Sequence, residues 1–202
     1  MHRVFNMLGI ACTIAAFVCI FVRENWEWVG PSPTHTTEEN NQWGSVHAML
    51  GLLACVVAWW QPIGAVFRCH PGDRFRFIFN IFHGFLGLGA LLMAFSAIMI
   101  AVVHFTPAFS NRDAAEGIYI AFIAVVGVCF ILLTILSVQH WYKARSNVTA
   151  VDMELVQSDG KRHVVNSPET VRTHRIMNVI FVFFICVAIG AAVSISVLLG
   201  VV

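Results

Sequence analysis

The fold is decided by the stretch IYIAFIAVVGVCFILLTILSV, residues 118–138, which contains no charged residue. A helix needs roughly 20 mostly apolar residues to cross a bilayer, because the hydrocarbon core is about 30 Å thick and each residue adds about 1.5 Å. An open sheet could not satisfy its backbone hydrogen bonds in lipid. The stretch therefore predicts a transmembrane helix.

Four further segments meet the same requirement. They run approximately over residues 4–22, 45–67, 77–103 and 177–202. The composition agrees, since 58% of the residues are hydrophobic and 11% charged, whereas soluble domains average about 45–50% and about 25%. We expect an all-α fold, an integral membrane bundle of five transmembrane helices. It divides into a transmembrane core (1–139), a polar loop (140–175) and a C-terminal helix (176–202).

Several function classes are excluded. The net charge is +1, from 12 basic and 11 acidic residues, so no electrostatic field attracts nucleic acid. The sequence contains no Walker A loop, no GxSxG and no HExxH motif. Its six cysteines are too few and too scattered for a disulfide framework. Membrane lipid is the expected surrounding.

Basic residues predict the orientation. Only Arg23 lies between the first two spans, and only Arg112 between the third and fourth. The other basic residues fall on the opposite side: Arg3, Arg68, Arg74, Arg76, Lys143, Arg145, Lys161, Arg162, Arg172 and Arg175. Cytosolic loops carry the excess of Lys and Arg. The N-terminus and the 140–175 loop are therefore expected to be cytosolic, and the C-terminus to face outward.

Three histidines lie near the starts of spans: His2, His47 and His83. An ionisable group at the hydrocarbon boundary is costly without a partner, so a functional role is the default hypothesis. Neutral imidazole is a common ligand of metals and of haem iron.

Two of these histidines share a pattern, His47-x-x-x-Gly51 and His83-x-x-x-Gly87. On a helix, residues four apart lie on the same face. A glycine there would let a flat macrocycle lie against the helix beside the imidazole. Close packing of helices through small residues is the alternative, and the spacing leaves both open.

The predicted topology places His2 and His83 at the cytosolic side, where they could ligate one iron as a pair. His47 falls at the outer side, where His104 is the candidate partner within the chain, although an interfacial side chain is the simpler interpretation of His104. His140 is expected to begin the polar loop. The remaining histidines are expected to be solvated in loops: His35, His70, His163 and His174.

The ordered set of motifs over residues 45–90 resembles the core of the cytochrome b561 superfamily, especially the animal ferric-chelate-reductase-like branch with a DOMON domain. The matching residues are His47 and Gly51, Gln61-Pro62-Ile63 with Ala65 and Arg68, Arg74, Arg76, and Phe79-Asn80-x-x-His83-x-x-x-Gly87. His2-Arg3 followed by Met7 is similar to the start of the preceding core helix.

The resemblance implies haem b, held in that family by four histidines on four consecutive helices. Mapped onto this chain, His2 and His83 complete one haem site, and His47 is a ligand of a second. The partner of His47 belongs to a first core helix that has no counterpart in this sequence, and the DOMON domain has none either. A second copy of the chain could supply the missing ligand.

The resemblance also implies electron transfer across the membrane, of the ferric or monodehydroascorbate reductase type. A small anionic cytosolic donor such as ascorbate would reduce the inner haem. Arg68 and Arg76 could pair with haem propionates or attract that donor. Ordinary positive charge on cytosolic loops explains both arginines equally well.

Two other functions are compatible with parts of the sequence. A haem-free membrane scaffold derived from the same core accounts for the missing helix. A metal-ion permease would call for acidic residues within the membrane, and the five predicted spans contain no Asp or Glu. The permease is therefore ranked last.

Overall fold

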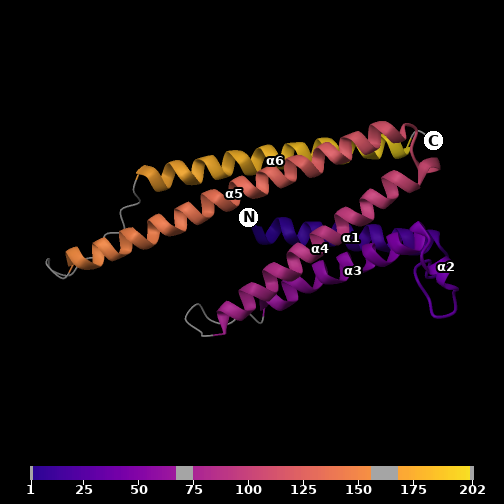
Figure 1. Cartoon of the computed structure of the whole chain (residues 1–202), viewed down its shortest axis with the longest axis horizontal. Helices are drawn as coiled ribbons and strands as arrows, with labels where there is room; N and C mark the ends of the chain where they lie inside the picture. The colour runs from indigo at the N-terminus through magenta and orange to yellow at the C-terminus, as the bar shows by residue number, and fades with distance from the viewer. Residues whose placement is uncertain (1, 67–74, 156–167, 201–202) are drawn as a thin grey trace. The chain divides into compact units, whose positions relative to one another are not determined.

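The computed structural model describes residues 2–66, 75–155 and 168–200, and within them it contains helices and no strand (Figure 1). Five helices are long and apolar enough to cross a membrane. They are α1 (His2–Arg23), α3 (Trp43–Val66), α4 (Arg76–His104), α5 (Arg112–Leu155) and α6 (Pro168–Gly200). The predicted all-α class and its five spans are confirmed.

The chain forms two compact units, residues 1–107 and 108–202. In the first unit α3 packs against α4 (Figure 1). The pair is antiparallel, since Trp43 at the start of α3 stacks on His104 at the end of α4. The buried residues of the two helices include Ala54, Ala90 and Ala97. Small side chains let the backbones of membrane helices approach closely, and these alanines explain the close packing.

The contacts of the first helix, α1, with α3 include a hydrogen bond and an aromatic contact, both made by Trp59. The indole Nε1 of Trp59 donates a hydrogen bond to Thr13 Oγ1 over 2.9 Å. Phe17 meets the same indole edge to face, with ring centroids 5.3 Å apart. Trp59 thus fixes α1 at this level of α3, since hydrogen bonds between membrane helices stabilise their association.

An ordered loop connects α1 to α3 and contains the short helix α2 (Thr37–Asn40). Asn40 holds the loop closed, because its amide accepts a bond from Ser32 N–H (2.9 Å) and donates one to Ser32 C=O (3.0 Å). Gly30 permits the tight path, since a Cβ there would overlap the indole of Trp28. The acidic connection between the first two spans is therefore a folded element.

The second unit is built from α5 and α6. Asn111 caps α5, because its Oδ1 accepts a hydrogen bond from Ala114 N–H over 3.0 Å. The end of α6 is tied to the same region, as both the N–H and the hydroxyl of Ser110 donate to Leu198 C=O (2.9 and 3.1 Å). Tyr119 is almost completely buried in this unit.

Two helices extend beyond the predicted spans. The apolar stretch ends at residue 138, but α5 continues to Leu155, because the polar residues that follow include neither Gly nor Pro. The last apolar segment begins at residue 177, but α6 begins at Pro168, a residue favoured at the first helical position. The described parts of the predicted polar loop are therefore helical.

Large apolar side chains cover the outer surface of the helices. Phe77 and Phe85 on α4 are 71% and 73% exposed, and none of the apolar window of α1 is buried. Soluble monomers rarely expose contiguous apolar surface of this kind. The five apolar helices are consistent with an integral multi-pass membrane protein.

Candidate functional site

His47 lies one helical turn inside α3 and is fastened to α4. Its Nδ1 is 2.8 Å from the backbone carbonyl oxygen of Ala97. A carbonyl can only accept, so Nδ1 carries the hydrogen and donates it. In the neutral ring, the free lone pair is then on Nε2. Histidines that ligate metals usually donate their other ring nitrogen in this manner, which orients the ring.

Aromatic rings surround this end of the α3–α4 pair. The ring of Phe105 meets His47 at 65°, with centroids 5.1 Å apart. Trp43, one turn before His47, stacks on His104 at 8° and 4.0 Å. Within the described part of the chain, the two imidazoles touch different aromatic partners and do not contact each other. His104 is thus held by a tryptophan at the helix end, as an interfacial side chain would be.

His83 lies near the opposite end of α4 and is exposed. Its ring is nearly parallel to that of Phe79, one turn earlier, at 12° and 5.6 Å. A Cβ built on Gly84 or Gly87 would meet no atom within 4 Å. The α4 surface at these two glycines is therefore uncovered, with room for either a ligand or a lipid chain.

The two histidines are far apart along the helix pair. His47 is bonded at the level of Ala97, which follows His83 by 14 positions on α4. At about 1.5 Å per residue, this separation is roughly 20 Å, most of the thickness of the hydrocarbon core. His47 and His83 therefore belong to two sites at different depths.

Several predicted site residues fall outside the described part of the chain. His2 begins α1, but its side chain is not described, and Arg68 and Arg74 lie in the undescribed segment between α3 and α4. Arg76 is half-buried at the start of α4. The pairing of His2 with His83 stays a prediction. The same holds for the contacts predicted for Arg68 and Arg76.

Gly51 on α3 is as open as Gly87. A Cβ there would meet no atom within 4 Å. The pattern His-x-x-x-Gly therefore marks two positions where a helix carries an imidazole and, one turn later, an uncovered backbone. Among the described residues, no group of three or more His, Cys, Asp or Glu side chains could hold a metal ion.

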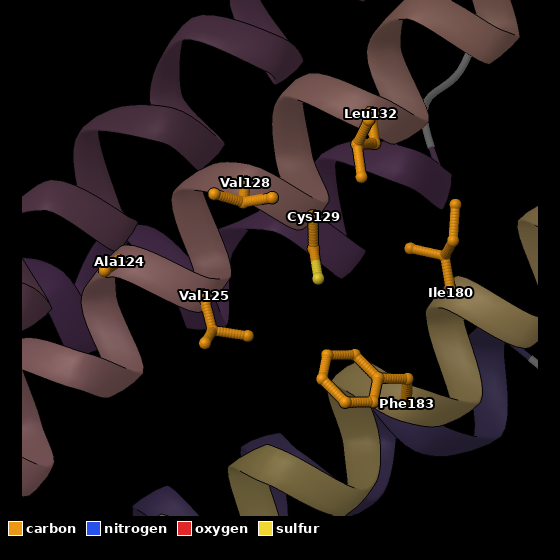
Figure 2. A pocket seen from close by; sticks show the side chains of 7 residues that line it. All are labelled: Ala124, Val125, Val128, Cys129, Leu132, Ile180 and Phe183. Atoms are coloured by element: carbon orange, nitrogen blue, oxygen red, sulfur yellow. The ribbon is translucent and has the colours of Figure 1, made fainter.

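A cavity of about 290 Å³ lies between α5 and α6 (Figure 2). Its lining is apolar: Ala124, Val125, Val128, Cys129 and Leu132 from α5, and Ile180 and Phe183 from α6. Figure 2 shows the Cys129 sulfur and the Phe183 ring turned toward its interior. No histidine lines this cavity, so it differs in kind from the positions around His47 and His83.

Sequence reasoning missed the partners of His47. The contact to Ala97 is made by a backbone carbonyl, which leaves no signal in the side-chain pattern. Phe105 follows the last residue of α4, where the sequence indicates only the start of a loop. The sequence signal that could have indicated this contact is the position of Phe105, an aromatic residue just after the end of a predicted span.

Part of the chain is similar to a Danio rerio protein named "Putative ferric-chelate reductase 1". The two are 31% identical over 104 residues, which are 52% of this chain and 16% of that protein. The chain thus spans a small fraction of this relative. No family model matches the chain, and no solved structure matches it. The resemblance to cytochrome b561-like proteins is supported at low identity over about half of the chain, and membership of that family stays a prediction.

Proposed function

We propose that this protein is a haem b-dependent electron carrier of the membrane, of the ferric reductase type. The observation that carries the proposal is the hydrogen bond from His47 Nδ1 to the Ala97 carbonyl, which leaves Nε2 available to bind a haem iron. The distant similarity to a protein named as a ferric-chelate reductase supports the same class of activity.

His83, with His2 as its proposed partner, would hold one haem at the cytosolic end of α4. His47 would hold a second at the outer end, with its partner supplied by another copy of the chain. Gly51 and Gly87 leave the helix surfaces beside the two imidazoles uncovered. A bound haem b would supply a one-electron couple between ferric and ferrous iron.

The role of the polypeptide is to orient the imidazoles and exclude water. Ala97 fixes the plane and the tautomer of His47, and Phe105 shields one side of its ring. Apolar side chains on α3 and α4 keep the surroundings dry, which affects the reduction potential of a haem. Arg68 and Arg76 would hold propionates or attract an anionic donor such as ascorbate from the cytosol.

A haem-free scaffold is the second candidate, and one contact favours it. The His47–Ala97 hydrogen bond joins α3 to α4 and satisfies Nδ1 of the imidazole without any cofactor. In that case His47 would have a structural role, and the open surface beside His83 would contact lipid. The two candidates therefore differ in the role of exposed His83, which binds haem in the first and only contacts lipid in the second.

The test uses the full chain, expressed with haem supplied and purified in detergent. We expect a b-type reduced-minus-oxidised spectrum, reduction by ascorbate and transfer of the electron to a ferric chelate. His83→Ala should abolish the signal of its haem while circular dichroism remains that of a helical protein. Exposed His35→Ala is the matched control. A helical wild-type protein with no haem spectrum would support the scaffold instead.

A further inference from the structure

Two histidines of the second unit, His140 on α5 and His174 on α6, lie against each other. Their ring centroids are 4.8 Å apart and the ring planes meet at 62°. The sequence alone indicates only a polar loop for both, with no role. Both instead lie within helices, close to the ends of the apolar spans Arg112–Lys143 and Arg172–Leu199.

We propose that His140 and His174 form a two-histidine site for a divalent transition-metal ion such as Zn²⁺ or Cu²⁺, which joins α5 to α6 at this end. Imidazole nitrogen is a preferred ligand of these ions. Each helix contributes one ligand, and water completes the coordination, since His140 is half-buried and His174 is exposed.

The separation of the rings fits shared coordination. With metal–nitrogen bonds of about 2.1 Å at angles of about 90–109°, two imidazoles on one ion have centroids roughly 4.6–5.3 Å apart. The observed 4.8 Å lies inside this range, so the helices already hold the rings at a suitable distance. Rotation about the side-chain bonds of the two histidines would direct one nitrogen of each ring to the shared ion.

The same distance argues against a haem between these two rings. Axial histidines lie on opposite faces of the macrocycle, which places their centroids about 6.4 Å apart with bonds of similar length. At 4.8 Å the rings leave no space for a porphyrin between them. This site is therefore separate in chemistry from the positions around His47 and His83.

Neighbouring charges determine which ions can bind. Lys143 follows His140 by three positions, so it lies on the same helical face, whereas Arg172 and Arg175, two and one positions from His174, lie on other faces of α6. Positive charge near the two imidazoles opposes the approach of a cation. The site should therefore select ions with strong affinity for nitrogen, in the order Cu²⁺ above Ni²⁺ above Mn²⁺, and should not bind Mg²⁺.

The site would fasten one end of the α5–α6 pair. At the other end, Ser110 makes two hydrogen bonds to the carbonyl of Leu198. An ion shared by His140 and His174 would attach α6 to α5 near the opposite ends of the two apolar spans. The pair would then be held by polar interactions at both ends and by apolar packing between them.

The experiment uses the full chain in detergent, stripped with EDTA and then titrated with CuCl₂ and ZnCl₂. Wild type is compared with His140→Ala, His174→Ala, the double variant and the control His35→Ala. Electron paramagnetic resonance of bound Cu²⁺ reports nitrogen coordination, and isothermal titration calorimetry reports affinity. Haem content is measured in parallel, so that loss of this site is distinguished from loss of haem.

We expect each single variant to weaken binding of one Cu²⁺ by at least about tenfold, because both imidazoles hold the same ion, and the double variant to weaken it at least as much. Haem content should not change. If either single variant binds Cu²⁺ with wild-type affinity, the proposal is overturned.

A second measurement needs no variant. Diethylpyrocarbonate modifies accessible imidazoles, and peptide mass spectrometry locates the modified residues. Zn²⁺ should protect His140 and His174 together in the wild-type chain while His35 remains reactive. If His140 and His174 are modified to the same extent in the presence and in the absence of Zn²⁺, they do not share an ion.

Discussion

The helix pairs α3–α4 and α5–α6 are both antiparallel and both carry histidines, but they arrange them differently. In α3–α4, His47 and His83 lie at different depths, each with an uncovered glycine one turn away. In α5–α6, the rings of His140 and His174 lie against each other. Separated imidazoles beside open backbone suit a flat ligand that needs space, whereas adjacent imidazoles suit a small ion. The placement of the histidine, more than its presence, determines the chemistry available.

The largest expected effect comes from blocking the open surface of α4. Gly87→Leu would fill the space beside His83 that a haem needs, so we expect its haem to be lost almost completely. Gly127→Leu is the matched control, because Gly127 on α5 is equally open and lies far from these histidines in sequence. Absorbance of the haem per mole of chain measures both.

If the protein is a haem-free scaffold, substitutions at Gly87 should have no functional cost. Since no atom lies within 4 Å of an added Cβ, a helix-favouring residue would be tolerated, and Gly87→Ala would stabilise the helix by up to about 1 kcal/mol. Unchanged haem absorbance in Gly87→Leu would therefore contradict a haem at this surface.

The next effect separates two roles of His47. The amide introduced by His47→Asn can still donate a hydrogen bond to the Ala97 carbonyl but offers no imidazole ligand, whereas His47→Ala loses both. We expect neither variant to hold the outer haem. Thermal unfolding should show His47→Ala less stable than His47→Asn by about 1 kcal/mol, the net contribution of one hydrogen bond. Equal stability would mean that the bond does not fasten α3 to α4.

A smaller effect is expected where Ser110 ties the start of α5 to the end of α6. Ser110→Ala removes the hydroxyl bond to Leu198 but keeps the backbone N–H bond. We expect a loss of about 0.5–1 kcal/mol in unfolding free energy. If the metal site joins the other end of the pair, excess Zn²⁺ should offset this loss in Ser110→Ala but not in a Ser110→Ala, His174→Ala double variant.

The smallest effect concerns the ordered loop before α3. Hydrogen bonds from the backbone and side chain of Thr36 lower the pKa of Glu39 from its ordinary value. Because the folded pKa is the lower one, this cap is fully formed above the ordinary carboxyl pKa and is lost as pH falls through the lowered value. The protection factor of the Thr36 amide, which is the intrinsic exchange rate divided by the observed rate at each pH, should fall at acidic pH, and Glu39→Gln should remove that pH dependence.

The sequence was sufficient to predict which segments form membrane-spanning helices, but it was insufficient to predict the contacts between those helices. Apolar runs such as residues 118–138 predicted all five spans, since length and hydropathy alone decide whether a helix can cross a bilayer. The ends were less predictable, because the polar continuation of α5 has good helix formers and no breaker. Gly51 and Gly87 of the motif His-x-x-x-Gly are open to an added Cβ, but so are other helical glycines such as Gly84, so openness alone does not single out the motif.

The pair formed by His140 and His174 could not be predicted in this manner. The two residues are distant in sequence, and each alone matches a solvated interfacial histidine. Only the packing of α5 on α6 brings their ring centroids to 4.8 Å. The hydrogen bond from His47 to the Ala97 carbonyl could not be predicted for a similar reason. Every residue of α4 has a backbone carbonyl, and only the packing of α3 on α4 determines which carbonyl His47 contacts.

Haem per polypeptide, measured by pyridine haemochrome on the helical, haem-supplied chain, tests the central claim most directly. We predict at least one haem b per chain, and a second where another copy supplies a partner for His47. His83→Ala should lower the value by one haem, while His35→Ala should leave it unchanged. A well-folded preparation without haem, or one whose haem is indifferent to His83, would contradict the account.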